Sequence, residues 1–204
     1  MLFRSDTDLD KFLLFDLYPR YSLRDYLLDA KTSMDDFYKG KFTEVAKLAD
    51  STYEFTDKIE GNKKIIDFSR KEIIDLCLVK ITKTLTIIDN LISVGYSLEN
   101  FGIKKIDFIF GTEFNLSLYY AELCEAVNEE QSGSEFIIND LWKQIKVEYS
   151  IDHETRIWSF PVQTVSDSES GIEKMHQGLC VFFNWPITLA QNGQFKIKLE
   201  ARLN

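Results

Sequence analysis

The sequence predicts an α+β fold, with N-terminal helices that include one long central helix packed on a C-terminal, mostly antiparallel sheet. Two observations predict it. Apolar residues between positions 62 and 95 recur at steps of three, four or seven, and from Lys143 onward they recur at every second position. The 204 residues are expected to form a single domain over residues 1–204, mainly helical over 1–131 and mainly β over 135–204.

The predicted central helix begins near Asn62 and ends near Gly95, a residue type that often terminates helices. Steps of three or four residues bring apolar side chains to one helix face, which would pack against the sheet. The β-branched residues from Val79 to Ile88 would also suit a strand. Because the helical spacing continues through them, the helix is the favoured interpretation.

Before this helix, residues 11–18 form a short apolar run, a buried strand or a helical turn, which Pro19 ends. Ser22 is a candidate N-cap for a short helix to Ala30, and Ser33 for a second helix to about Ile59. A turn at 61–62 would make the second helix and the central helix an antiparallel pair.

After the central helix, the run 106–110 predicts a short strand, and 114–127 returns to helical spacing. The polar stretch 131–134 is the predicted loop between the helical and β parts. The strands of the C-terminal sheet are predicted over 145–151, 158–162, 179–189 and 195–203. A turn at 152–155, a polar loop at 166–178 and an Asn192–Gly193 hairpin would connect them.

Two prolines fall within the predicted strands, at Pro161 and Pro186. Since proline cannot donate a ladder hydrogen bond, each should lie at an edge, a bulge or an unbonded position. The predicted core is Ile73, Cys77, Ile81, Leu85, Ile88, Val147, Tyr149, Trp158, Val181, Phe183, Trp185, Ile197 and Leu199. The third tryptophan, Trp142, could anchor a partner.

The formal charge of -9 is confined to residues 1–140, because residues 141–204 carry equal numbers of basic and acidic side chains. An acidic surface repels phosphate, so nucleic-acid binding is not expected. Three dispersed cysteines indicate a reducing compartment, and a cytoplasmic location is expected. No run of about eighteen apolar residues and no signal peptide occur, so no membrane association is expected.

Catalytic motifs for dinucleotide, phosphate-loop, hydrolase and zincin chemistry are absent from the sequence. His176 and Cys180 are four residues apart, but no second pair completes a metal site. We therefore predict no catalytic residues, no metal and no cofactor. The carboxylates that could form acid–base pairs, or otherwise solvate a helix, are Glu113, Glu122, Glu125, Glu129 and Glu130. Solvation is the favoured interpretation.

Two functional hypotheses follow. The first is a non-enzymatic interaction protein, either a subunit of an assembly or an acidic inhibitor or immunity-type protein. It would bind a basic protein partner through Glu122, Glu125, Glu129 and Glu130. An oligomer or a multi-subunit assembly is also expected to be possible. The alternative is a small enzyme without a known motif, with a site formed by His176 and Glu173. The missing motifs favour the non-enzymatic hypothesis.

Overall fold

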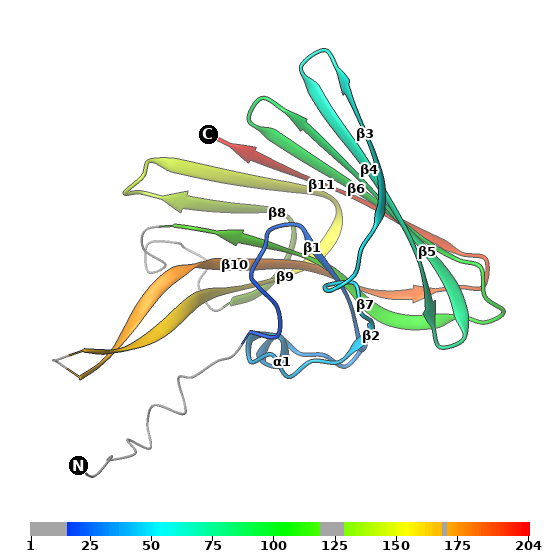
Figure 1. The fold of residues 1–204 in the computed structure, drawn as a ribbon, viewed down its shortest axis with the longest axis horizontal. Coiled ribbons are helices and arrows are strands. Elements are labelled where there is room, and N and C mark those ends of the chain that lie inside the picture. The colour runs from blue at the N-terminus through cyan, green and yellow to red at the C-terminus, as the bar shows by residue number, and fades with distance from the viewer. Residues whose placement is uncertain (1–15, 119–128, 169–170) are drawn as a thin grey trace, which may run out of the picture.

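The computed structural model describes residues 16–118, 129–168 and 171–204. They form one antiparallel sheet of eleven strands, curled into a half-barrel (Figure 1). In chain order the elements are β1 (Arg24–Leu28), α1 (Met34–Tyr38), β2 (Glu44–Ala46), β3 (Glu54–Glu60), β4 (Lys63–Ile74), β5 (Cys77–Ile88), β6 (Leu91–Asn100), β7 (Ile106–Leu116), β8 (Glu129–Asp140), β9 (Ile145–Ser168), β10 (Gly171–Leu189) and β11 (Gln194–Leu203).

The curl of the sheet brings strands that are distant in its order face to face. The order is β2-β1-β7-β10-β9-β11-β6-β5-β4-β3, and β8 pairs with β9 beside this path. The end strand β2 nevertheless lies against β4 near the other end. Side chains on the concave face of β1 can therefore reach those of β5 and β6 across the half-barrel.

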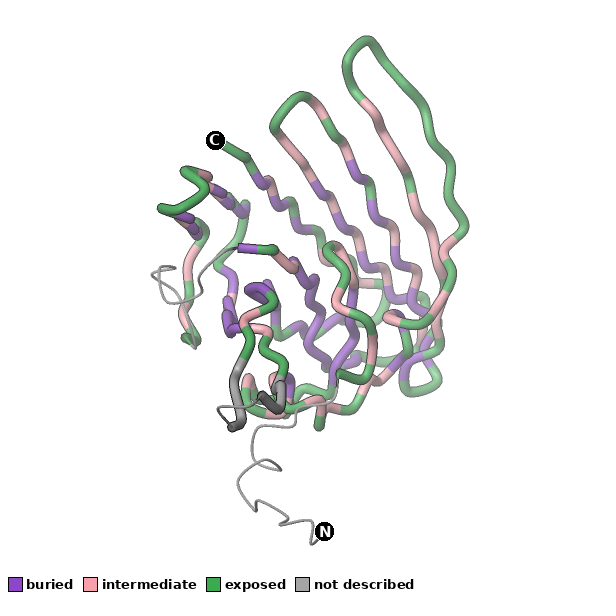
Figure 2. Tube along the Cα trace, turned by 60° about the vertical axis from the view of Figure 1, so that its left-hand side comes forward, coloured by how far each residue is buried: buried purple, intermediate pink, exposed green. Residues whose placement is uncertain are grey.

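Each face of the sheet has its own hydrophobic core. The larger core fills the concave face and includes Ile81, Phe110 and Phe183. The smaller core lies on the convex face, where Trp158 and Phe182 pack under the short helix α1. Figure 2 shows that burial decreases from these cores toward the tips of the β3–β4 and β5–β6 hairpins. Both faces of the central strands are therefore apolar, which is unusual for an antiparallel sheet.

The short helix α1 is held by a cap at its N-terminus and by packing of its buried face. Ser33 and Asp36 form a capping box, in which Ser33 Oγ accepts from the Asp36 amide and the Asp36 carboxylate accepts from the Ser33 amide. Phe37 then stacks on Phe182 with ring centroids 4.1 Å apart. This helix covers part of the convex core instead of forming a layer of its own.

The predicted α+β class is wrong, because residues 62–95 form strands β4, β5 and β6 instead of a long central helix. Side chains four residues apart lie on one face of a strand as well as of a helix, so Cys77, Ile81 and Leu85 all point into the concave core. The backbone reverses between β4 and β5 with positive φ at Asp75 and Leu76. Ile73 is 60% exposed instead of buried.

The other predicted helices are also mostly strands. The short helix at 22–30 is β1, and the helix at 33–59 is α1 followed by β2 and β3. The helix at 114–127 begins inside β7, and residues 119–128 lie outside the described residues. The apolar run 11–18 also lies mostly outside them.

Three predicted connections are parts of strands. The loop at 131–134 lies inside β8, which has a register shift between Gly133 and Glu135. The turn at 152–155 lies inside β9, and the segment 166–178 belongs to the ends of β9 and β10 around residues 169–170. Small polar residues are thus accommodated by irregular pairing along long strands instead of ending them.

The C-terminal strands lie where the alternation predicts them, and most of the predicted core is buried. Pro161 of β9 pairs with Leu179 of β10 and lies beyond Ser159, the last residue of β9 with a described partner in β8. Pro186 of β10 pairs with Ile109 of β7 and lies beyond Asn184, the last residue of β10 that pairs with β9. Each proline thus has a described paired strand on one side only, which fits the predicted edge or unbonded position. Among the described residues, no helix is long and apolar enough to cross a membrane.

Candidate functional site

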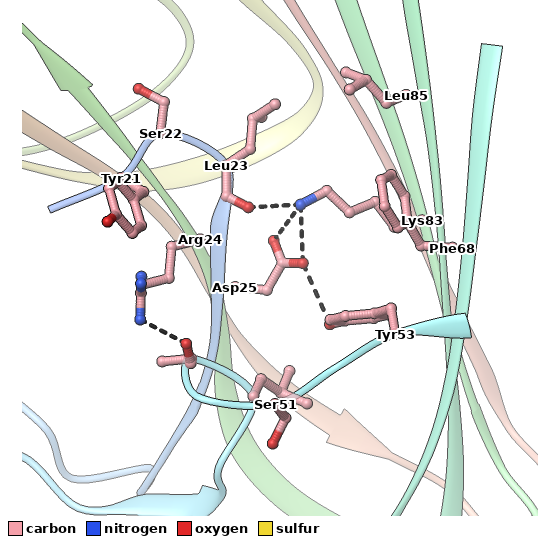
Figure 3. Close-up of a pocket in the computed structure, with 12 residues that line it drawn as sticks. Tyr21, Ser22, Leu23, Arg24, Asp25, Ser51, Tyr53, Phe68, Lys83 and Leu85 are labelled. Carbon is pink, nitrogen blue, oxygen red and sulfur yellow. Dashed lines mark hydrogen bonds and ion pairs between the residues drawn. The ribbon is translucent and has the colours of Figure 1, made fainter. Parts of the chain in front are cut away.

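A pocket of about 290 Å³ opens on the concave side of the half-barrel, between the β1 end of the sheet and the β4–β5 hairpin. Residues just before and within β1 form one side of it, and Tyr53, Phe68 and Lys83 form the other (Figure 3). Its complete lining is Tyr21, Ser22, Leu23, Arg24, Asp25, Leu48, Ala49, Ser51, Tyr53, Phe68, Lys83 and Leu85.

A buried ion pair forms the floor of this pocket. Lys83 Nζ lies 3.0 and 3.1 Å from the two carboxylate oxygens of Asp25 and donates to the carbonyl oxygen of Leu23 at 2.6 Å. Both charged residues are at least nine-tenths buried. A lysine at this position is unexpected, since its neighbours on the same face of β5, Ile81 and Leu85, belong to the apolar core. The carboxylate of Asp25 compensates its charge.

Three hydroxyl groups extend the ion pair across the half-barrel. Tyr96 on β6 donates to Asp25 Oδ1 at 2.7 Å and lies 2.9 Å from the Thr112 hydroxyl on β7. Tyr53, just before β3, donates to Asp25 Oδ2 at 3.3 Å. Burial, together with the nearby Asp25 carboxylate, raises the pKa of Tyr96 well above its ordinary value. The Tyr96 phenol is therefore a neutral donor that helps to hold β1 against β6.

The walls of the pocket are aromatic. The Phe68 ring lies 5.9 Å from Lys83 Nζ, and Tyr21 lies at the rim with its side chain largely exposed. Arg24 packs over the Tyr21 ring at 5.3 Å and donates to the carbonyl oxygen of Ala49 at 2.5 Å. The pocket thus combines a polar floor with apolar ring surfaces, as is common in small-molecule sites.

A second buried carboxylate, Glu113 on β7, faces the convex side of the sheet. It accepts hydrogen bonds from Tyr26 at 2.7 Å, Asn115 at 2.7 Å and Arg20 at 3.0 Å. The Cys180 thiol lies 3.6 Å away, and burial followed by the charge of Glu113 raises the pKa of this thiol. The prediction that Glu113 belongs to a solvated surface is therefore wrong.

The four predicted partner-binding glutamates are only partly within the described residues. Glu122 and Glu125 lie outside them. Glu129 and Glu130 are exposed at the start of β8, where they pair with Ser159 and Trp158 of β9. Glu130 also lies 3.9 Å from Arg156. Contact of these residues with a basic partner stays a prediction.

The structure does not bring the candidate metal and catalytic residues together. Cys180 is buried beside Glu113, whereas the ring nitrogens of His176 are buried without a hydrogen-bond partner. The side chain of Glu173, the other half of the alternative enzyme site, lies outside the described residues. Within the described part of the chain, no group of three metal-ligating side chains occurs. Trp158 and Trp185 are buried in the cores as predicted, and Trp142 is largely exposed.

Sequence reasoning missed the pocket residues Asp25, Tyr53 and Lys83, and also Tyr96, which donates a hydrogen bond to Asp25. The available signal was a charge within an apolar alternation: Lys83 lies between Ile81 and Leu85 at two-residue spacing, and Asp25 lies between Leu23 and Leu27. A period of two was required to recognise either charge as inward-facing. The assigned helices concealed it.

Comparison with known proteins places the fold. The structure superimposes on the crystal structure of the 4-alpha-glucanotransferase of Thermococcus litoralis with a TM-score of 0.81 and 21% sequence identity, over 96% of this chain and 29% of that one. A galactose mutarotase-like protein from Clostridium acetobutylicum gives a TM-score of 0.59 at 10% identity, over 91% of this chain and 80% of that one. At these identities the likeness concerns the fold.

The sequence comparisons point to one group of proteins. An alpha-amylase of Pyrococcus abyssi is 26% identical over 98% of this chain and 28% of its own length. A 4-alpha-glucanotransferase of Thermococcus kodakarensis is 25% identical over 93% of this chain and 27% of its own length. The chain therefore spans little more than a quarter of these curated relatives.

These matches overturn the prediction of a non-enzymatic interaction subunit, because the relatives are carbohydrate-active enzymes and the matched region is one of their domains. The absence of catalytic motifs, which favoured that hypothesis, did not distinguish a binding protein from one domain of an enzyme. The family model for "Alpha-amylase/4-alpha-glucanotransferase, C-terminal" matches residues 2–199, so the chain belongs to this family.

Proposed function

We propose that this chain is the β domain of an enzyme that acts on α-glucans, and that it contributes sugar contacts to that enzyme. The observation that carries the proposal is the family match over residues 2–199. The relatives are named either alpha-amylase or 4-alpha-glucanotransferase. Hydrolysis and glucanosyl transfer differ in the acceptor, whereas the α-glucan is common to both, so the substrate class is better supported than the reaction.

Most cleavage of glycosidic bonds uses two carboxyl groups on either side of the bond, about 5–9.5 Å apart. The buried carboxylates among the described residues are Asp25, Glu113 and Asp140. Asp25 and Glu113 face opposite sides of the sheet, and each is paired with a cation. Asp140 accepts from the backbone amides of Trp142 and Lys143. We therefore propose that the reacting carboxylates belong to another part of the enzyme.

Native gel electrophoresis with embedded polysaccharide tests this proposal. The 204-residue chain should be retarded in a gel that contains glycogen, relative to gels without polysaccharide or with dextran, whose linkages differ. Retardation that depends on glycogen concentration gives the affinity. Equal mobility in all three gels would contradict glucan binding by this domain.

Three further expectations stand as proposals beside this function. One is a single domain over residues 1–204. Another is a cytoplasmic location, supported by the free thiols of the two described cysteines, Cys77 and Cys180. The third is contact between the acidic residues Glu129 and Glu130 and a basic surface, supported by their exposure on β8.

A further inference from the structure

The concave pocket described above has the size and chemistry of a site for one sugar ring. We infer that it binds a single terminal glucosyl unit of an α-glucan, with Asp25 and Lys83 at the floor and Tyr53 and Phe68 on the wall; this inference rests on the proposed function. A volume of about 290 Å³ is near the lower limit of ligand pockets, so it suits a small ligand and not a longer stretch of glucan.

The charges of the floor favour a neutral ligand with hydroxyl groups. Asp25 and Lys83 carry opposite charges 3.0 Å apart and lie among apolar side chains. An anion such as phosphate would be repelled by the carboxylate, and a cation by the ammonium group. A sugar hydroxyl can donate to the first and accept from the second, so it can satisfy both groups at once.

One contact of the floor is suited to exchange with a ligand. The hydrogen bond from Tyr53 to Asp25 is 3.3 Å long, whereas that from Tyr96 to the same carboxylate is 2.7 Å. Tyr53 is also only partly buried and precedes β3, whereas Tyr96 is buried within β6. A sugar hydroxyl could therefore take the place of the Tyr53 hydroxyl at Asp25, and Tyr53 could in turn hydrogen-bond to the sugar.

The walls offer surfaces for the apolar C–H face of a pyranose ring. In Figure 3, Tyr21 and Arg24 approach from one side of the floor, and Phe68 and Tyr53 from the other. Tyr21 is 63% exposed, so its ring can cover a ligand at the rim without leaving a core. Aromatic rings bury a large area at low cost in rotamer freedom, which is why they often line binding sites.

Isothermal titration of the 204-residue chain with maltose tests the inference. Wild type should bind maltose, and Tyr53→Phe should weaken binding by roughly three- to tenfold, the equivalent of one hydrogen bond. Ser51→Trp, which fills the pocket from its lining, should abolish binding. Tyr38→Phe is the matched control, because Tyr38 lies on α1 and packs against the convex core. Thermal melting of each variant identifies any that fails to fold.

The outcomes separate this inference from the proposed function. Equal maltose affinity in wild type, Tyr53→Phe and folded Ser51→Trp would overturn the pocket assignment. If glycogen still retards the chain in the gel, the proposed function would survive that result. Binding of inorganic phosphate in place of maltose would also overturn the inference, because it would show a charged ligand. Loss of both maltose binding and glycogen retardation would count against both proposals.

Discussion

Asp25 and Glu113 are buried carboxylates on adjacent strands, β1 and β7, in which Arg24 pairs with Glu113 and Asp25 with Thr112. Each has a cation and a tyrosine hydroxyl as partners. They differ in their surroundings, because Asp25 borders a cavity and Glu113 is fully enclosed on the convex side. The same pairing of charges can thus hold strands together in both places. Within the described residues, the concave pair borders a pocket, whereas Glu113 of the convex pair has no exposed surface.

Among the variants proposed here, those that remove the cation beside Asp25 or Glu113 should lower the free energy of unfolding most, and by unequal amounts. Lys83→Met leaves Asp25 charged and buried, so the free energy of unfolding should fall by about 3–5 kcal/mol. Arg20→Met should cost about 1.5–3 kcal/mol, because the Arg20 side chain is partly exposed and Glu113 keeps its bonds to Tyr26 and Asn115. Urea unfolding followed by tryptophan fluorescence measures both. A larger loss for Arg20→Met would contradict this comparison.

Space on the convex side can be probed with a single methyl group. A Cβ at Gly111 would lie 2.1 Å from the Phe182 ring, in the core beneath α1. Gly111→Ala should therefore cost about 1–3 kcal/mol through overpacking. Gly95→Ala is the matched control, because a Cβ there meets nothing within 4 Å, and its stability should equal or slightly exceed that of wild type. Equal stability of the two variants in thermal melts would mean that the convex core is loosely packed.

Alkaline pH should affect the two carboxylate sites alike. Burial, followed by the neighbouring carboxylate, raises the pKa of Tyr96 beside Asp25 and of Tyr26 beside Glu113. Well below pH 10, the ordinary pKa of tyrosine, both phenols are protonated in the folded and the unfolded chain. Above that pH the unfolded chain loses these protons and the folded chain keeps them, so stability falls by about 1.4 kcal/mol per pH unit for each tyrosine.

The Tyr96→Phe and Tyr26→Phe variants isolate these contributions. Each substitution should lower the free energy of unfolding at pH 7. Each should also reduce the decline of that free energy above pH 10 by about 1.4 kcal/mol per pH unit, the contribution of one tyrosine. Urea unfolding at a series of pH values between 7 and 11 measures the slopes. A slope unchanged by either substitution would show that the phenol concerned ionises in the folded chain.

The sequence predicts strands best where the spacing of apolar residues fits a strand and does not also fit a helix. From Ile145 onward, apolar and polar residues alternate too regularly for a helix, and β9, β10 and β11 follow. In β5, however, Cys77, Ile81 and Leu85 fit both periods, and inward-facing Lys83 interrupts the apolar alternation. The charge that makes the site chemically distinctive thus weakened the evidence for the strand that carries it.

The candidate site could not be predicted without the curl of the sheet. Asp25 and Lys83 are 58 residues apart and belong to strands near opposite ends of the sheet order. Neither residue is part of a motif, and the ion pair exists only because β1 faces β5 across the concave side. Local periodicity identifies which side chains face inward, whereas strand order and curvature decide which of them meet.

The central claim, that the concave carboxylate site binds sugar and the convex one does not, can be tested most directly by NMR. Backbone amide shifts of the ¹⁵N-labelled chain would be followed during a maltose titration. Saturable shifts should concentrate around Asp25, Tyr53 and Phe68, with little change near Phe37 and Phe182 on the convex face. Saturable shifts confined to the convex face, or none at either site, would contradict the account.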